Sequence, residues 1–228
     1  MARLNRLEDR LGYQFQQQNL LTRAVTHRSF SEANNERLEF LGDSILNYLI
    51  AAALFARFDQ AAEGELSRLR ARLVKQATLA EVAREINLGD HLTMGSGELK
   101  SGGFERDSIL SDALEAIIGA IYLDGGIESA SGCVYSLFAS RLDNLSETDL
   151  EKDAKTRLQE YLQGIGESVP EYELLHMKGK SPNQVFEVEC RAAPLESAIR
   201  ASGSSRRRAE QSAAELALRE LVDEGQES

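Results

Sequence analysis

The sequence is poor in the residues that stabilise disulfide-rich or fibrous proteins, with two cysteines, three prolines and no tryptophan in 228 residues. Cys133 and Cys190 fall in segments that we assign to different domains, and neither has a partner at a metal-ligand spacing. We therefore expect two free thiols. No proline occurs before Pro170, which leaves the first two thirds of the chain free to form long helices.

Long hydrophobic runs are also missing. The longest uncharged apolar stretch, residues 44–56, is shorter than the roughly 20 residues that cross a membrane. Charges are spread through the N-terminal segment MARLNRLEDRLGYQF, which excludes a secretory signal. We therefore expect no membrane partner and a cytoplasmic location.

Basic residues are outnumbered, with 26 Lys and Arg against 37 Asp and Glu and a formal net charge of −11. Residues 1–150 hold 15 basic and 22 acidic residues, and residues 151–228 hold 11 and 15, so neither part is basic. Taken alone, this balance argues against a nucleic-acid partner, because phosphate binding uses Lys and Arg. The 42% hydrophobic content is enough for one or two folded domains.

The hydrophobic pattern changes along the chain. It is helical as far as residue 143, with helices predicted at 37–57, 66–85, 108–123 and 127–142. An acidic segment without a sustained apolar face follows. The remainder predicts the order α-β-β-β-α, with elements at 155–163, 172–177, 185–191, 196–201 and 204–222. We therefore expect an α+β protein of two domains, 1–145 and 153–222, with a linker at 146–152 and a tail at 223–228.

Two apolar helices carry acidic residues on one face. On a helix with 100° per residue, Glu36, Glu39 and Asp43 lie within about a sixth of a turn of one another. Leucine and isoleucine cover the rest of this helix, which we expect to be buried. In the helix at 108–123, Asp112 and Glu115 also share a face. Glu63, at the start of another predicted helix, is a further candidate.

If these two helices face each other, Glu39, Asp43, Asp112 and Glu115 form one site. At 4 Å and an effective dielectric constant near 20, each pair of like charges costs about 4 kcal/mol, so protons or cations must neutralise them. An all-oxygen ligand set favours Mg²⁺ or Mn²⁺ over Zn²⁺. The alternative is a solvated acidic face. Two acidic pairs on two nearly all-apolar helices favour the metal site, in a divalent-metal carboxylate hydrolase or binder.

Basic side chains gather at the start of the last predicted helix. Arg206, Arg207 and Arg208 follow a Gly-Ser-Ser sequence and occupy the first turn, where the helix dipole disfavours cations. Free backbone N–H groups and three guanidinium groups together make an anion site, and phosphate is its natural occupant. The alternative is a basic cluster on a solvated helix. Local placement of arginine thus outweighs the net charge as a guide to the partner.

Several segments resemble the ribonuclease III family, in the same order along the chain. They are NERLEFLGDSIL (35–46), AVTHRS (24–29), GSGELKSGG (95–103) and SILSDALEAIIGAIYLD (108–124). The resemblance implies an endonuclease domain at 1–145 that forms a homodimer and cuts double-stranded RNA. By matched position it implies that Glu39, Asp43, Asp112 and Glu115 hold Mg²⁺, with Asp43 and Glu115 as catalytic residues. It places Glu36 and Glu63 beside the cleft with a supporting or RNA-facing role, and we assign His27 to packing or loop structure.

The C-terminal part resembles the double-stranded-RNA-binding domain, through KTRLQEYLQG (155–164), PEYE (170–173) and the arginine-headed helix. Such domains recognise the shape of the A-form helix over about 16 base pairs. The resemblance implies that Thr156, Gln159 and Glu160 face a minor groove and that Ser204, Ser205, Arg206, Arg207 and Arg208 contact phosphates. The sequence departs from the family at Pro182, where a histidine is usual, and at Ala154, where proline is common.

The resemblance also implies products with 5′-phosphate and 3′-hydroxyl ends and roles in maturing ribosomal and messenger RNA. Two other classes of protein remain open. A non-catalytic double-stranded-RNA-binding protein would share the C-terminal domain, and a metal-dependent hydrolase of small phosphates would share the carboxylates. The intact carboxylate set speaks against the first, and the arginine-headed helix speaks against the second.

Overall fold

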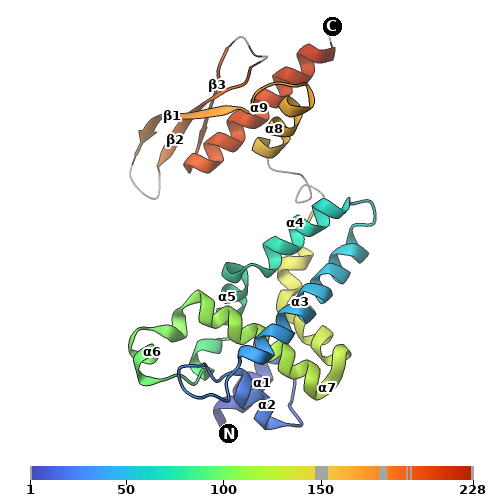
Figure 1. Ribbon diagram of the computed structural model, residues 1–228, viewed down its shortest axis with the longest axis vertical. Coiled ribbons are helices and arrows are strands. Elements are labelled where there is room, and N and C mark those ends of the chain that lie inside the picture. The colour runs from blue at the N-terminus through green and yellow to red at the C-terminus, as the bar shows by residue number, and fades with distance from the viewer. Residues whose placement is uncertain (1, 147–153, 180–183, 194, 196, 227–228) are drawn as a thin grey trace. The chain divides into compact units, whose positions relative to one another are not determined.

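The computed structural model describes residues 2–146, 154–179, 184–193, 195 and 197–226 (Figure 1). The chain divides into two compact units, which we call the first unit (Met1–Leu150) and the second unit (Glu151–Ser228). Each has its own hydrophobic core among the described residues. The predicted linker, 146–152, lies almost wholly outside the described residues, so the predicted domain limits stay a proposal.

The first unit is all helical in the part that is described. Its elements are α1 (Ala2–Leu11), α2 (Gln18–Ala24), α3 (Glu36–Arg57), α4 (Glu63–Val74), α5 (Gln76–Glu85), η1 (Leu88–His91), α6 (Ser96–Lys100), η2 (Gly103–Glu105) and α7 (Asp107–Asp143). The helix predicted at 66–85 is divided between α4 and α5, because Lys75 has an extended backbone (φ −65°, ψ 148°). The two helices predicted at 108–123 and 127–142 adjoin as α7, which is broken at Gly126 (φ 77°).

Helix α3 packs against α7 in the core of the first unit, with Leu46, Ile50 and Leu54 buried. In the part of the chain that is described, α3 is also the one helix long and apolar enough to cross a membrane by length and composition. A core helix of a folded domain meets the same criterion, and the packing of α3 accounts for its composition.

The expectation that α3 is buried all round is wrong for one face. Phe40, Tyr48 and Phe55 are 78%, 61% and 74% exposed. At 100° per residue these three side chains lie on one side of the helix. The first unit thus presents an aromatic stripe to solvent.

The second unit has the predicted order α-β-β-β-α. Its elements are α8 (Ala154–Gly164), β1 (Glu171–Lys178), β2 (Val185–Arg191), β3 (Ile199–Gly203) and α9 (Arg206–Gln226). The strands form an antiparallel sheet in the order β1-β2-β3, and α8 and α9 lie together beside it (Figure 1). The third strand begins at Ile199 instead of residue 196. Pro182 lies outside the described residues. The two-domain α+β fold is confirmed.

Candidate metal centre and nucleic-acid interface

Two glycines let α3 and α7 approach until their main chains touch. A Cβ atom on Gly42 would overlap the carbonyl oxygen of Glu115 and lie 3.0 Å from the amide nitrogen of Gly119. A Cβ on Gly119 would overlap the carbonyl oxygen of Leu38. Gly42 lies between Glu39 and Asp43, and Gly119 lies one turn after Glu115. The glycine contact therefore brings the acidic faces of the two helices together.

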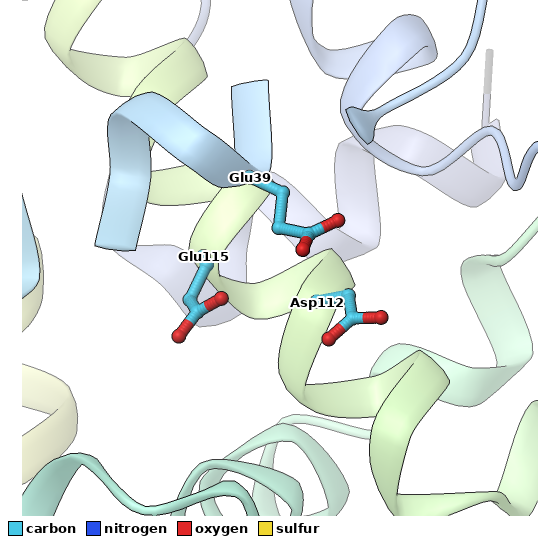
Figure 2. A group of neighbouring side chains, drawn as sticks. All are labelled: Glu39, Asp112 and Glu115. Atoms are coloured by element: carbon cyan, nitrogen blue, oxygen red, sulfur yellow. The ribbon is translucent and has the colours of Figure 1, made fainter. Parts of the chain in front are cut away.

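Three carboxylates meet at this contact. Each of Glu39, Asp112 and Glu115 offers an oxygen within 4.8 Å of the others, and all three side chains are partly buried. Figure 2 shows Glu39 reaching from α3 and Asp112 and Glu115 from α7, with the carboxylates gathered between the helices. We call these three residues the acidic cluster. All its ligand atoms are oxygen, the donor set that suits Mg²⁺ and Mn²⁺.

Asp43 lies beside the acidic cluster. Its Oδ1 accepts a hydrogen bond from Nδ2 of Asn47 at 2.8 Å, which fixes the carboxylate one turn along α3 from Glu39. The charge of Asp43 adds to those that act on Glu115. Asn47, which the sequence analysis did not identify, thus holds one of the four predicted ligands.

The carboxylates repel one another strongly. Burial, together with the negative charges of Asp43, Asp112 and Glu39, raises the pKa of Glu115 to about 8. Burial is also the main cause of the raised pKa of Glu39 and of Asp112. The positive charge of Arg28 offsets only part of the raised pKa of Glu39 and of Asp112. A bound cation would supply the remaining charge that the ionised cluster needs.

The two supporting acidic residues lie in different places. Glu36, on the turn before Glu39, contacts Arg28 with Oε1 3.3 Å from Nη1. Glu63 begins α4 and accepts a hydrogen bond from Ser67 at 2.7 Å. About 27 Å of helix separates Glu39 from the far end of α3 at Arg57, and Glu63 begins α4 beyond that end. The structure brings Glu36 near the acidic cluster and does not bring Glu63 there.

A pocket of about 430 Å³ adjoins the acidic cluster and shares Glu39 and Asp112 with it. His27 and Ser29 form part of its wall, with Nδ1 of His27 2.8 Å from Oγ of Ser29. Ser29 Oγ also accepts a hydrogen bond from the amide of Gly95 at 2.9 Å, which joins two segments far apart in the sequence. These contacts fit the loop role that we expect for His27.

The RNA-binding candidates of the second unit lie at its surface. Thr156, Gln159 and Glu160 are exposed on α8. At the start of α9, the Ser205 hydroxyl accepts a hydrogen bond from the amide of Arg208 at 3.2 Å and caps the helix. The remaining predicted phosphate contacts, Ser204, Arg206 and Arg207, are exposed on the same turn.

The three arginines are held differently. Arg206 Nε donates to Glu210 at 2.8 Å, and Arg208 Nη1 donates to Ser204 Oγ at 3.1 Å. Arg207 has no polar partner among the described residues. A phosphate on this turn would meet one free guanidinium group and two that are already oriented.

Replacing Gly42 by alanine is expected to push α3 away from α7, because the added methyl group overlaps main-chain atoms that no side-chain rotation can move. We expect a loss of about 3 kcal/mol or more in the free energy of unfolding, at the upper end of overpacking effects. Urea unfolding measures it. Gly132→Ala is the control. It lies inside α7 with nothing near its Cβ position, and it should stabilise by about 0.5–1 kcal/mol. Equal stability of the two variants would contradict the close helix contact.

Comparison with known proteins agrees with both units. The Ribonuclease-III-like family pattern matches residues 17–142, and the Double-stranded RNA binding motif matches residues 154–221. Ribonuclease 3 of Hahella chejuensis is 57% identical over 217 residues, which cover 95% of this chain and 96% of the relative. Ribonuclease 3 of Azotobacter vinelandii is also 57% identical, over 95% of both chains.

Solved structures match the first unit. The crystal structure of the nuclease domain of ribonuclease III from Campylobacter jejuni is 46% identical with a TM-score of 0.61, covering 64% of this chain and all of that one. A second structure of that domain, described as showing flexibility in a region involved in dimer formation, is 49% identical with a TM-score of 0.58. It covers 59% of this chain and 95% of that one. Family patterns, relatives and fold agree, and this chain therefore belongs to the ribonuclease III family of double-strand-specific endoribonucleases.

Proposed function

We propose that the chain cleaves double-stranded RNA by hydrolysis at the acidic cluster, with Mg²⁺ as the cofactor and Mn²⁺ able to replace it. The observation that carries this proposal is the meeting of three partly buried carboxylates from α3 and α7, with ligand atoms within 4.8 Å of one another. Glu39, Asp43, Asp112 and Glu115 would hold the metal. The other members of the family provide the substrate class, and the all-oxygen ligand set supports the choice of metal.

Each residue has a separate task in this mechanism. Glu115 and Asp43, the proposed catalytic residues, act from opposite helices, and Asn47 keeps the Asp43 carboxylate in place. Ser111 Oγ, 3.3 Å from Oδ1 of Asp112, orients that side chain. A metal held by Glu39, Asp43, Asp112 and Glu115 would supply activation of water for attack on phosphorus and stabilisation of the attacking and leaving oxygens. Cleavage on the 3′-oxygen side of phosphorus leaves 5′-phosphate and 3′-hydroxyl ends.

Proton release from Glu115 should couple stability to pH. In the folded protein this carboxyl keeps its proton up to about pH 8, whereas in the unfolded chain it releases the proton near its ordinary pKa of 4.5. The folded state therefore binds more protons between these values, and its stability falls as pH rises through them. Unfolding in urea with EDTA at pH 5 to 9 measures the fall.

Mg²⁺ should restore more stability at pH 8 than at pH 6, because protons compete with the cation for Glu115. In Glu115→Gln this proton is absent, so the variant should lose much of the pH dependence. A metal-free stability that rises from pH 5 to pH 8 would contradict the assignment.

The second unit would bind the duplex. We propose that Thr156, Gln159 and Glu160 face a minor groove and that Ser204, Ser205, Arg206, Arg207 and Arg208 contact phosphates. All of them except the half-buried Ser205 are exposed on α8 or at the start of α9, which supports this assignment. In the cell, duplex regions of ribosomal RNA precursors, messenger RNAs and transfer RNA precursors would be the substrates, in the cytoplasm.

We propose that the enzyme is a homodimer. The aromatic stripe of α3, formed by Phe40, Tyr48 and Phe55, is the exposed apolar surface that a second copy would cover. The relative from Campylobacter jejuni, whose nuclease domain has a region involved in dimer formation, supports the same arrangement. A dimer carries two acidic clusters and can cut both strands of one duplex.

One gel separates the proposal from its alternatives. The proposed enzyme cuts labelled duplex RNA with Mg²⁺ and leaves it intact with EDTA. A non-catalytic RNA-binding protein shifts the duplex without cutting it. A hydrolase of small phosphates neither shifts nor cuts it. Either of the last two results would overturn the proposal.

A further inference from the structure

The pocket beside the acidic cluster contains polar groups that the proposed metal site does not use. Arg28, Asn35, Arg106 and Ser108 line it, together with Glu39 and Asp112 of the acidic cluster. Because two cluster residues also form part of its wall, a molecule in the pocket touches the groups that would hold the metal. The pocket is therefore placed to receive the part of the substrate next to the bond that is cut.

Asn35 is the polar residue that the fold leaves unexplained. Only 3% of its surface is exposed. Its main chain begins α3, with the carbonyl oxygen accepting from the amides of Leu38 and Glu39 at 2.9 Å each. Asn35 lines the pocket, and no hydrogen bond of its side-chain amide occurs among the described residues; its amide atoms are also not among the fully buried ones. An amide that lines a pocket and makes no hydrogen bond to the protein is free to bond a ligand with hydrogen-bonding groups of its own.

Two arginines in the same pocket are held by carboxylates. Nη1 of Arg28 lies 3.3 Å from Glu36, and Nη1 of Arg106 lies 2.6 Å from Glu98. Guanidinium groups bind phosphate with the same fork geometry that they use for carboxylate. Ion pairs between exposed side chains are weak, so a phosphate can replace Glu36 without a large cost, whereas Glu98 is only 21% exposed and holds Arg106 more firmly.

We propose that this pocket binds the ribose-phosphate unit of the nucleotide next to the scissile phosphate on the same strand. Arg28 and Arg106 take its phosphate, and the amide of Asn35 takes its 2′-hydroxyl, which can both donate and accept a hydrogen bond. This inference rests on the proposed hydrolysis of duplex RNA at the acidic cluster. The proposed site would distinguish RNA from DNA by contacting the 2′-hydroxyl. Glu36 and Glu98 would hold the two arginines in place before the substrate binds.

The charges of the site favour separate binding of the scissile phosphate and the adjacent phosphate. The acidic cluster repels the substrate, and bound metal offsets that repulsion at the phosphate being cut. The adjacent phosphate still lies beside Glu39 and Asp112. Arg28 and Arg106, whose charges are balanced by Glu36 and Glu98 before substrate arrives, would offset this repulsion where the phosphate replaces a carboxylate partner.

The phosphate contact is tested by binding, in the full chain carrying Glu115→Gln so that the RNA stays intact. The cleavage position on a short duplex is first mapped with the unmodified protein. Single methylphosphonates, which are uncharged, are then placed within two nucleotides of the cut. A methylphosphonate at one position next to the cut should weaken binding of the duplex about tenfold, as expected for loss of a charge-assisted contact. The same modification should have little effect in the variant Arg28→Gln/Arg106→Gln, which has already lost the contact.

Arg84→Gln is the matched control. Arg84 is 47% exposed against 49% for Arg106, and it forms an ion pair with Asp107 away from this pocket. This variant should keep the full methylphosphonate effect. The proposal would be overturned if methylphosphonate still weakened binding in the double arginine variant. It would also be overturned if no methylphosphonate position weakened binding when both arginines are present.

The sugar contact is tested with single 2′-deoxy substitutions in the same duplex. One substitution next to the cut should weaken binding about fivefold, within the range for one hydrogen bond, and Asn35→Ala should remove this sensitivity. Thermal unfolding establishes that Asn35→Ala is folded. If the variant remains as sensitive to the deoxy substitution, Asn35 does not read the sugar. If unmodified protein fails to cut the duplex at all, the proposed function fails, which is a different result from either of these.

Discussion

Replacing Glu115 by glutamine is expected to abolish cleavage of duplex RNA in Mg²⁺ while binding of the duplex remains. Glutamine has nearly the same shape but removes a negative charge from the acidic cluster, so the site should hold the metal poorly. Metal stabilisation of the reacting oxygens contributes several kcal/mol. A loss of about 4 kcal/mol corresponds to a rate about 1,000-fold lower. Single-turnover cleavage measures the rate, and electrophoretic mobility shift measures binding.

Glu128→Gln is the control for this variant. Glu128 is also a glutamate of α7, but it is exposed and outside the acidic cluster. It should cleave at the unmodified rate. Full activity of Glu115→Gln would contradict the metal assignment, whereas equal loss in both variants would show that any charge change in α7 is harmful.

Ending the chain after Leu145 is expected to weaken duplex binding at physiological salt by at least about tenfold. This removes the second unit and its arginine-headed helix. The truncated protein should fold, because the first unit has its own core. Each phosphate contact that is lost should reduce the slope of log affinity against log salt by about 0.9 or less. Fluorescence anisotropy at 50 to 250 mM salt measures both quantities.

Arg207→Gln in the full chain is the companion to the truncation. Arg207 has no polar partner among the described residues, so its loss removes a phosphate contact without breaking an ion pair. For this variant, the slope of log affinity against log salt should fall by the amount that one phosphate contact contributes. A truncated protein with unchanged affinity and slope would contradict the RNA-binding role of the second unit.

Local patterns in the sequence predicted much of the fold. Period-3.6 runs without proline marked the long helices, and alternation marked β1 and β2. The division between α4 and α5 was missed because Lys75 is an ordinary helix former, and its extended backbone leaves no mark in the sequence pattern. The start of β3 was misplaced because residues 196–201 alternate as well as 199–203 do. The open face of α3 was missed because its aromatic residues read like core residues.

The site was predicted in part for similar reasons. Helical spacing put Glu39 and Asp43 on one face and Asp112 and Glu115 on another, but the contact between those faces is a tertiary property. Gly42 is the sequence signal for it, since a glycine inside an apolar helix indicates a close approach. The sequence did not show that Glu63 lies beyond the far end of α3, because position along the chain does not give the distance between residues in space. Asn35 gave no signal at all, because only the structure shows that it is nearly buried and lines the pocket beside the acidic cluster.

The glycine contact between α3 and α7 also limits how the protein can recover from mutation. When two side chains clash, a smaller residue on the partner helix can relieve the overlap. At Gly42 the opposing atoms are the carbonyl of Glu115 and the amide of Gly119, which every amino acid at those positions would have. A selection for restored growth after loss at Gly42 should therefore return glycine at that codon, and second-site suppressors in the opposing helix should be absent.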